Sequence, residues 1–264
     1  MIRALWTAAS GMLSQQLNVD VIANNLSNVN TAGFKKSRVE FQELMYETIR
    51  PPGREAAREA EIPSGVEVGH GVRVAATQRL HSQGNLQQTN NPLDLAIEGE
   101  GFFRLEMPDG TYTYTRDGGF KLGSERELVN SQGYKLSVEG GGQIPDNALE
   151  IGIAPDGTIT ALVPGVQAPK EVGRVVLVRF VNPAGLQSLG QNLYRETVSS
   201  GEAITGKETK SGVGRVMQGY LEMSNVQVVE EMVNLIVAQR AYEINSKAIQ
   251  TSDEMLALAN NLRR

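Results

Sequence analysis

Residues that could bind a metal or act as a nucleophile are scarce in this chain. It contains two histidines, His70 and His81, and no cysteine. The histidines stand eleven positions apart without a thiolate partner, a spacing that matches no zinc site. Without cysteine, disulfides and thiolate catalysis are excluded. We therefore expect both histidines to be surface or turn residues, and we predict no metal site.

Four carboxylates could in principle supply an acid–base pair. They are Asp94, Glu98, Glu100 and Asp117. Hydrolysis by paired carboxylates needs two of them about 5–9 Å apart across a cleft, and nothing in the pattern places two so. We interpret them as turn and surface carboxylates.

Nucleotide and acyl-transfer motifs are also incomplete. Gly69-His70-Gly71 and Gly99-Glu100-Gly101 begin like a dinucleotide fingerprint, but Val74 and Arg104 occupy the next required glycine positions. Neither a GxSxG elbow nor a phosphate-binding Walker loop is present. The sequence predicts no catalytic residue and no cofactor. An enzyme or a carbohydrate-binding β module remains the competing class of function.

Charge and hydropathy exclude two kinds of partner. The formal net charge is −5 and no basic run is present, so we expect no nucleic acid partner. No segment reaches the ~20 apolar residues of a membrane span, so we expect no membrane insertion. Polar residues interrupt the N-terminal segment, and we expect no cleaved signal peptide. They are Ser10, Ser14, Gln15 and Gln16.

The elements that organise the chain begin with an expected helix over residues 3–27. Apolar residues recur every seven positions along it, which is typical of helices that pack side by side. They are Leu5, Met12, Val19 and Leu26, with Ala8, Ile22 and Val29 three residues after members of that series. Asn28, Asn30 and Gly33 are expected to end the helix, because Asn and Gly adopt left-handed geometry at little cost.

A longer helix is expected over residues 225–262, roughly 57 Å in length. Its seam alternates steps of four and three: Val237, Ala241, Ile244, Ala248, Thr251, Met255, Leu258 and Leu262. Ser224 and Gln227 suggest a capping box. Glu230 and Glu231 near the start, with Arg263 and Arg264 at the end, complement the helix dipole.

A second apolar stripe lies about 100° around the same helix. It consists of Val228, Leu235, Tyr242, Ile249 and Leu256. The N-terminal helix can cover one stripe only, and burying such a side chain is worth roughly 1.5–3 kcal/mol, so the other stripe favours association. Periodicity leaves open a helical hairpin packed on its own β domain without any polymer.

Between the ends, the pattern changes to short strands and regular turns. Residues 112–115, 119–122, 133–138 and 172–181 have strand-forming composition, the last most strongly. Turns such as Pro108-Asp109-Gly110 and Pro155-Asp156-Gly157 separate them. This spacing predicts an antiparallel all-β domain over residues 71–219.

Residues 46–65 fit neither pattern. Pro51, Pro52 and Pro63 forbid one continuous helix there. We interpret the segment as an extended arm that orders against neighbours, with a mobile surface loop as the alternative.

Three blocks of sequence resemble the bacterial flagellar rod, hook and hook-associated proteins. Residues 23–35, Ala-Asn-Asn-Leu-Ser-Asn-Val-Asn-Thr-Ala-Gly-Phe-Lys, are similar to the family's N-terminal signature. Residues 84–103, from Gly-Asn-Leu-Gln-Gln to Gly-Glu-Gly-Phe-Phe, and residues 239–247, Gln-Arg-Ala-Tyr-Glu-Ile-Asn-Ser-Lys, resemble the next two. They follow in the family's order and bracket nearly the whole chain. Ser27, where alanine is common, is a mild departure.

Within this family, the length, Leu5-Trp6 and residues 41–53 favour a distal rod subunit. Hook subunits are similar at both ends but much longer in the middle, and proximal rod subunits depart more around residues 46–65. Either remains an alternative.

The resemblance implies a non-enzymatic structural subunit. It would be exported by the flagellar type III apparatus, polymerise helically with itself into a rigid hollow shaft across the periplasm, transmit torque from motor to hook and pass exported subunits. Its implied partners are proximal rod proteins, hook protein and the L- and P-ring bushing.

The expected fold is α+β, with long N- and C-terminal coiled-coil helices flanking an antiparallel all-β domain. We divide the chain into residues 1–33 (inner-tube helix), 34–70 (linker and arm, with a rod-specific segment at 46–65), 71–219 (β domain) and 220–264 (inner-tube helix).

Three sets of residues carry these functions. The assembly residues are Leu5, Met12, Val19, Ile22, Leu26, Leu235, Val237, Tyr242, Ile244, Ile249, Met255 and Leu258. The family signature is Asn24, Asn25, Asn28, Thr31, Gly33 and Phe34. The resemblance associates the arm with stiffness, through Tyr46, Ile49, Pro51, Pro52, Gly53 and Pro63.

Overall fold

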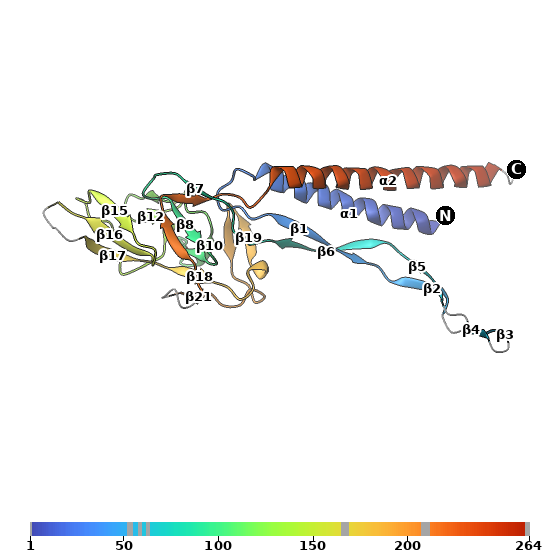
Figure 1. The fold of residues 1–264 in the computed structure, drawn as a ribbon, viewed down its shortest axis with the longest axis horizontal. Coiled ribbons are helices and arrows are strands. Elements are labelled where there is room, and N and C mark those ends of the chain that lie inside the picture. The colour runs from blue at the N-terminus through green and yellow to red at the C-terminus, as the bar shows by residue number, and fades with distance from the viewer. Residues whose placement is uncertain are drawn as a thin grey trace. The chain divides into compact units, whose positions relative to one another are not determined.

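A computed structural model describes residues 2–51, 55–57, 60–61, 64–164, 169–206 and 212–261. The fold is α+β, with one helix at each end of the chain and antiparallel strands between them (Figure 1). Contacts divide the chain into two units. Unit 1 comprises Met1–Ser27, Ser37–Gln78 and Gln227–Arg264, and unit 2 comprises Asn28–Lys36 and Arg79–Val226.

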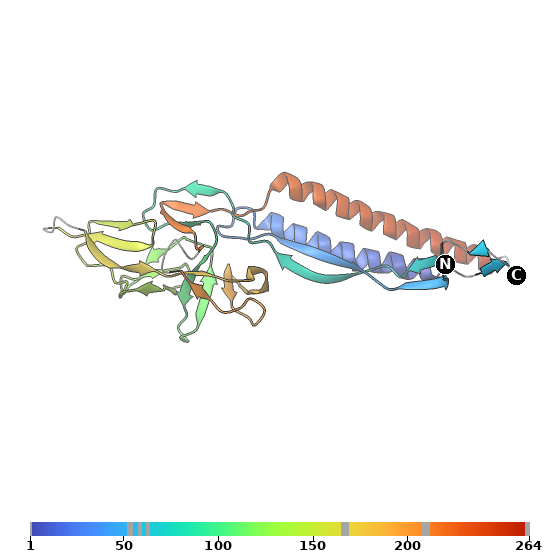
Figure 2. The same ribbon diagram turned by 60° about the horizontal axis from the view of Figure 1, so that its bottom comes forward.

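Unit 1 contains both helices, α1 (Ile2–Ser27) and α2 (Val228–Asn261). They lie side by side and run antiparallel (Figures 1 and 2). Asn25 near the end of α1 bonds Glu231 near the start of α2, and Gly11 faces Asn245. At 1.5 Å per residue, α2 is about 51 Å long. Leu262, Arg263 and Arg264 lie outside the described residues.

The capping box predicted at Ser224 is wrong, because α2 begins later, at Val228. The Ser224 hydroxyl accepts a hydrogen bond from the Val226 N–H at 3.3 Å, and the first helical bond runs from the Glu231 N–H to the Gln227 carbonyl. The intervening Asn225 is held by side-chain bonds within unit 2, which keeps this stretch out of the helix. Glu230 and Glu231 do occupy the first turn, as predicted.

The rest of unit 1 is a ribbon of paired strands. Three pairs follow one another between residues 37 and 79: β1 (Ser37–Glu43) with β6 (Val72–Arg79), β2 (Tyr46–Arg50) with β5 (Val66–Gly69), and β3 (Glu55–Ala57) with β4 (Ala60–Glu61). β1 contacts α1 and buries Val39, whereas every residue of β2 is exposed. The described part of the expected arm, residues 46–65, is therefore a two-stranded ribbon.

Unit 2 contains the larger sheets. A nine-stranded sheet has the order β11-β12-β13-β9-β10-β20-β19, with β18 pairing both β9 and β21. Its strands are β9 (Phe102–Glu106), β10 (Tyr112–Thr115), β11 (Lys121–Leu122), β12 (Leu128–Val129), β13 (Lys135–Leu136), β18 (Leu177–Arg179), β19 (Gln187–Gly190), β20 (Leu193–Arg195) and β21 (Ile204–Thr205). A short 3-10 helix, η1 (Pro183–Gly185), precedes β19.

A four-stranded sheet and two pairs complete unit 2. The sheet has the order β14 (Val138–Glu139), β17 (Lys170–Val175), β16 (Thr158–Leu162), β15 (Glu150–Ile153). β8 (Leu95–Glu98) pairs with β22 (Arg215–Gln218), and β7 (Leu86–Gln88) pairs with β23 (Tyr220–Glu222). Each of these strand pairs in unit 2 is antiparallel, in agreement with the predicted antiparallel all-β domain. Unit 2 resumes at Arg79 rather than near residue 71, because most of β6 belongs with β1 in unit 1.

The strand expected at residues 172–181 is in fact two strands. β17 ends at Val175 in the four-stranded sheet, and β18 starts at Leu177 in the nine-stranded sheet. Between them, the Val176 N–H donates to the Ser137 carbonyl at 3.0 Å. The β-branched run thus changes sheets, and its residues contribute to two apolar clusters. The larger includes Phe103, Leu105, Phe120 and Ile159, and the smaller includes Phe102, Tyr114, Phe180 and Tyr194.

Candidate assembly surfaces and the buried charge cluster

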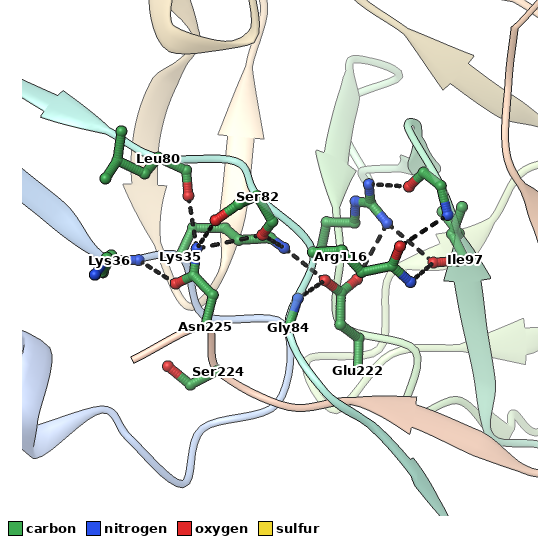
Figure 3. A network of polar contacts seen from close by, with 12 residues as sticks. Lys35, Lys36, Leu80, Ser82, Gly84, Ile97, Arg116, Glu222, Ser224 and Asn225 are labelled. Atoms are coloured by element: carbon green, nitrogen blue, oxygen red, sulfur yellow. Dashed lines mark hydrogen bonds and ion pairs between the residues drawn. The ribbon is translucent and has the colours of Figure 1, made fainter. Parts of the chain in front are cut away.

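A cluster of three charged side chains lies inside unit 2 (Figure 3). Lys35 Nζ lies 2.5 Å from Glu222 Oε1, and Arg116 Nη1 lies 3.1 Å from Glu222 Oε2. All three side chains are almost fully buried. Two cations therefore share one carboxylate away from water, an arrangement that is costly unless every group is hydrogen-bonded.

Backbone groups complete this cluster. Lys35 also donates to the Ser82 carbonyl at 2.6 Å, and Arg116 donates to the carbonyls of Ile97 and Gly99. The Gly84 N–H donates to Glu222 Oε1 at 2.9 Å. Burial lowers the pKa of Lys35, while the neighbouring Glu222 carboxylate opposes that shift. The cluster joins residues far apart in sequence, and its buried setting suits a structural role.

The turn before Lys35 contains four of the predicted signature residues, Asn28, Thr31, Gly33 and Phe34. Asn28 Oδ1 accepts a hydrogen bond from the Thr31 hydroxyl at 3.3 Å, and Phe34 is buried. Gly33 has φ +69°, and a Cβ placed there would lie 2.5 Å from the Asp117 nitrogen. Gly33 also donates its N–H to the Glu222 carbonyl at 2.7 Å. Only glycine fits this position, since both the backbone angle and the space exclude a side chain.

His81, predicted to be a surface or turn residue, lies in the segment between β6 and β7 and is half-buried. Its ring makes edge contacts with Phe102 and Tyr194, each with centroids 5.4 Å apart. Burial, with the positive charges of Lys35 and two arginines nearby, lowers the pKa of His81 to about 3. His81 is therefore neutral at pH 7. His70 is exposed, as predicted, and lies 3.9 Å from Glu47.

Among the four carboxylates interpreted as turn and surface residues, Asp94 belongs to a turn but does not lie on the surface. It is buried and accepts hydrogen bonds from Thr89 Oγ1 at 2.7 Å and Asn91 Nδ2 at 2.9 Å. Burial also raises the pKa of Asp117, whose carboxylate accepts the Gly119 N–H. Both side chains thus stabilise local turns. Glu98 and Glu100 are exposed.

The contact between α1 and α2 is made largely by small and polar residues. The partly or fully buried positions on α2 recur mostly at steps of three or four residues: Glu231, Leu235, Ala238, Ala241, Asn245, Ser246, Ile249, Ser252 and Leu256. On α1, a Cβ added to Gly11 would lie 2.9 Å from Asn245 Nδ2, so the two helices approach closely there. This inward face of α2 contains the second predicted stripe, except that Val228 and Tyr242 are exposed.

The described residues of the first predicted seam of α2 are exposed, apart from Ala241, which is half-buried. Val237, Ile244 and Leu258 are 61 %, 66 % and 63 % exposed, and Met255 is half-exposed. On α1, the predicted residues Leu5, Met12, Val19 and Leu26 are half-buried and Ile22 is buried. A different set on α1 faces outward: Ile2, Trp6, Leu13 and Leu17. We call the exposed apolar residues of both helices the helix surface.

An open groove runs between the two helices. Its lining consists of Gln16, Val19, Gln239, Tyr242 and Glu243. Two of the predicted assembly residues, Val19 and Tyr242, thus come together from opposite ends of the chain. Their spacing in sequence gives no hint of this juxtaposition.

The ribbon exposes the arm residues that the structure describes. Tyr46 and Ile49 are more than half exposed, and Pro51 is exposed. Pro52, Gly53 and Pro63 lie outside the described residues. Near the start of α1, Arg3 pairs with Glu47 of β2 at 2.8 Å. This exposed ion pair links the helix to the ribbon within unit 1.

The described residues include no group of three or more His, Asp or Glu side chains placed to hold a metal ion. Neither helix, over its described length, is apolar enough along its span to cross a bilayer.

Three family models match the chain. They are "Flagella basal body rod protein" at residues 5–35, "Flagellar hook protein FlgE/F/G D1 domain" at residues 96–161 and "Flagellar basal body rod FlgEFG protein C-terminal" at residues 217–262. The first match covers most of α1 and the signature turn, and the third covers α2.

Full-length relatives extend this result. The chain is 55 % identical to the flagellar basal-body rod protein FlgG of Borreliella burgdorferi, over 100 % of both chains. It is 48 % identical to the FlgG protein of Buchnera aphidicola from Acyrthosiphon pisum, over 99 % of this chain and 100 % of the relative. It is 44 % identical to that of Caulobacter vibrioides, with the same coverage.

Proposed function

The chain belongs to the family of flagellar basal-body rod proteins, and we propose that its subunits stack helically into a rigid, hollow shaft that transmits torque from motor to hook. It is a structural subunit of the distal rod, in the flagellar basal body. The observation that carries the proposal is the helix surface. Apolar side chains such as Trp6, Leu13, Val237 and Ile244 are exposed on both helices after α1 and α2 have paired.

Contacts between subunits would cover this surface. Burying one large apolar side chain is worth roughly 1.5–3 kcal/mol, so several such residues per subunit provide a strong drive to associate. The exposed seam of α2 keeps heptad spacing from Val237 to Leu258, which suits coiled-coil packing against a helix of a neighbour. The terminal helices would then form the inner tube through which other exported subunits pass, and unit 2 would form the outer wall.

The ribbon would supply further lateral contacts. A two-stranded ribbon is marginally stable in water when it stands alone, and the β2 strand is exposed along its whole length. Tyr46, Ile49 and Pro51 are available there to a neighbouring subunit. Extra contacts between subunits reduce hinge freedom, which a torque-bearing shaft requires.

The function is structural rather than enzymatic, like that of the rod protein relatives. The chain assembles with other rod and hook components, and we propose that these are the proximal rod proteins on one side and the hook protein on the other. The L- and P-ring bushing would surround the shaft. Export would use the flagellar type III apparatus with the N-terminal segment retained, since that segment is part of α1, which packs against α2.

Polymerisation of the purified chain tests this function. The only tryptophan, Trp6, is 72 % exposed on α1 and reports on burial of the helix surface. We expect a concentration-dependent blue shift of its fluorescence together with tubes in the electron microscope. A monomer that stays soluble at high concentration, with both helices formed and Trp6 still exposed, would contradict the proposal. Straight tubes identify a distal rod, whereas bendable tubes would favour the hook alternative.

A further inference from the structure

Two asparagine side chains hold the segments where the chain passes between the units. The chain crosses from one unit to the other after Ser27, Lys36, Gln78 and Val226. Within unit 1, Asn25 bonds residues beside these crossings, and within unit 2, Asn225 does the same. Each acts inside its own unit.

Asn225 joins three segments of unit 2 (Figure 3). Its Oδ1 accepts the Lys36 N–H at 2.7 Å, and its Nδ2 donates to the Leu80 carbonyl at 2.9 Å. Nδ2 also lies 2.9 Å from Ser82 Oγ and 3.2 Å from the Ser82 carbonyl. In addition, the Leu80 N–H donates to the Lys36 carbonyl at 2.9 Å. The ends of three crossing segments are thus tied together at one side chain.

Asn25 joins three segments of unit 1 in the same way, and its side chain is 2 % exposed. Its Oδ1 accepts the Ser37 N–H at 2.9 Å, and its Nδ2 donates to the Ser37 carbonyl at 2.9 Å. Nδ2 also donates to Glu231 Oε2 at 3.2 Å. The end of α1, the start of β1 and the first turn of α2 therefore meet at this amide.

The chemistry of the amide explains why asparagine suits both positions. Its side chain has one acceptor and two donor hydrogens, so it can pair with a backbone N–H and a backbone C=O at once. Aspartate would lose the donors, and alanine would leave several backbone groups without these partners. Lys36 and Ser37 are consecutive, so the polar backbone groups of this crossing are held from both sides.

We propose that Asn25 and Asn225 are positioning residues that stiffen the passage of the chain between the two units. A stiff passage lets torque applied to one unit reach the other without being lost in bending. The mechanical purpose rests on the proposed function, but the stiffness itself is a property of the subunit.

Paired spin labels measure this stiffness directly. The chain lacks cysteine, so Asp253→Cys in unit 1 and Leu149→Cys in unit 2, both exposed, give one label in each unit. Doubly labelled subunits are diluted into polymers of the unlabelled chain. We expect Asn25→Ala and Asn225→Ala to broaden the label-to-label distance distribution. Asn225→Asp, which keeps the acceptor and loses the donors, should give an intermediate width.

Hydrogen exchange on the unassembled chain gives an independent readout for Asn225. We expect the Lys36 and Leu80 amides to exchange about five- to tenfold faster in Asn225→Ala, the change expected from loss of one or two hydrogen bonds. The melting temperature of unit 2 should stay close to that of the unmutated chain, because only local hydrogen bonds are lost.

Matched controls remove an asparagine that bonds only locally. Asn130→Ala breaks bonds to the Gln132 and Tyr134 N–H groups in a turn, and Asn18→Ala breaks a contact with Gln15 within α1. Neither should broaden the distribution. Unchanged widths in both Asn25→Ala and Asn225→Ala polymers would overturn the inference. If the unmutated chain forms no polymer, the proposed function fails instead, and the Lys36 and Leu80 exchange rates decide the role of Asn225.

Discussion

Unit 2 hides its large apolar side chains, whereas unit 1 displays them. In unit 2, Leu95, Phe103, Leu105 and Phe120 are buried almost completely and form one continuous cluster. In unit 1, the buried apolar residues among those described are the few smaller side chains Ala8, Ile22, Val39 and Ala238. Unit 2 therefore removes its apolar residues from water within the subunit, whereas unit 1 leaves exposed apolar area available to a partner.

The contact between α1 and α2 also differs from the core of unit 2, because it contains several small and polar residues. Gly11, Ser14, Asn245 and Ser252 lie in or near that contact, where a stable isolated hairpin would carry leucine and isoleucine. The free energy gained by pairing α1 with α2 is therefore modest, since it scales with the apolar area removed from water. Other large apolar residues, such as Trp6, Val237 and Ile244, stay exposed on the outward face.

Ile244→Asp should have the largest effect, a complete loss of polymers. It places a charge at a position that is 66 % exposed in the subunit and that assembly would bury. Sedimentation and electron microscopy measure the loss, and circular dichroism should show unit 2 unchanged. Gln250→Asp, an exposed change on the same helix without loss of an apolar residue, is the control. Normal tubes from Ile244→Asp would show that the exposed seam is not an assembly surface.

Glu222→Gln should be the most damaging change inside unit 2. It leaves Lys35 and Arg116 buried without a carboxylate, at a cost of about 3–5 kcal/mol in unfolding free energy. Lys35→Met instead leaves the Glu222–Arg116 pair intact and should change the free energy by less than about 1.5 kcal/mol. Urea denaturation followed by tyrosine fluorescence measures both. Equal losses for the two variants would contradict this description of the cluster.

Acid should destabilise unit 2 partly through His81. Its pKa is about 3 in the folded state and 6.5 when unperturbed, so the unfolded chain binds the proton more readily. This contribution to stability is complete above pH 6.5 and is lost as the pH falls toward 3, by at most about 1.4 kcal/mol per pH unit. His81→Phe should reduce the slope between pH 6 and 4 relative to the unmutated chain. If the unfolding free energies of the two proteins change with pH in parallel, His81 does not contribute to the acid sensitivity.

Ile49→Ser in the ribbon should have the smallest effect on the subunit. The side chain is exposed, so the unfolding free energy should change by less than about 0.5 kcal/mol. The polymer should nevertheless bend more easily, because the exposed side of Ile49 would contact a neighbouring subunit. Persistence lengths from electron micrographs test this, with Thr48→Ser as the control. Unchanged stiffness would remove the reason for giving this position a role in the shaft.

The helices and the all-β middle were predictable because their patterns are local. Seven-residue spacing located α1 and α2 to within a few residues, and residues 112–115 form the expected strand β10. Which stripe of α2 would be covered was not predictable. Both stripes are apolar, and the choice depends on small and polar contacts such as Gly11 with Asn245 and Asn25 with Glu231.

The charge cluster could not be predicted for a different reason. Lys35 and Glu222 are 187 positions apart, and Arg116 is 106 positions from Glu222, so no local spacing relates them. Taken singly, each of these three residues would be predicted to be an ordinary surface charge. The one available clue was that Lys35 ends the segment of residues 23–35 that resembles the family's N-terminal signature. His81 was misjudged likewise, because its aromatic neighbours Phe102 and Tyr194 come from β9 and β20.

The pairing of the first helix with the last has a consequence for timing. Asn25 bonds Glu231, which lies 206 positions later in the sequence. Nearly the entire chain must therefore be available before unit 1 can complete its fold. A truncated chain that lacks α2 can still present α1, but it never offers the joint surface made by both helices. Assembly through that surface would therefore incorporate chains that carry both helices and exclude truncated chains that lack α2.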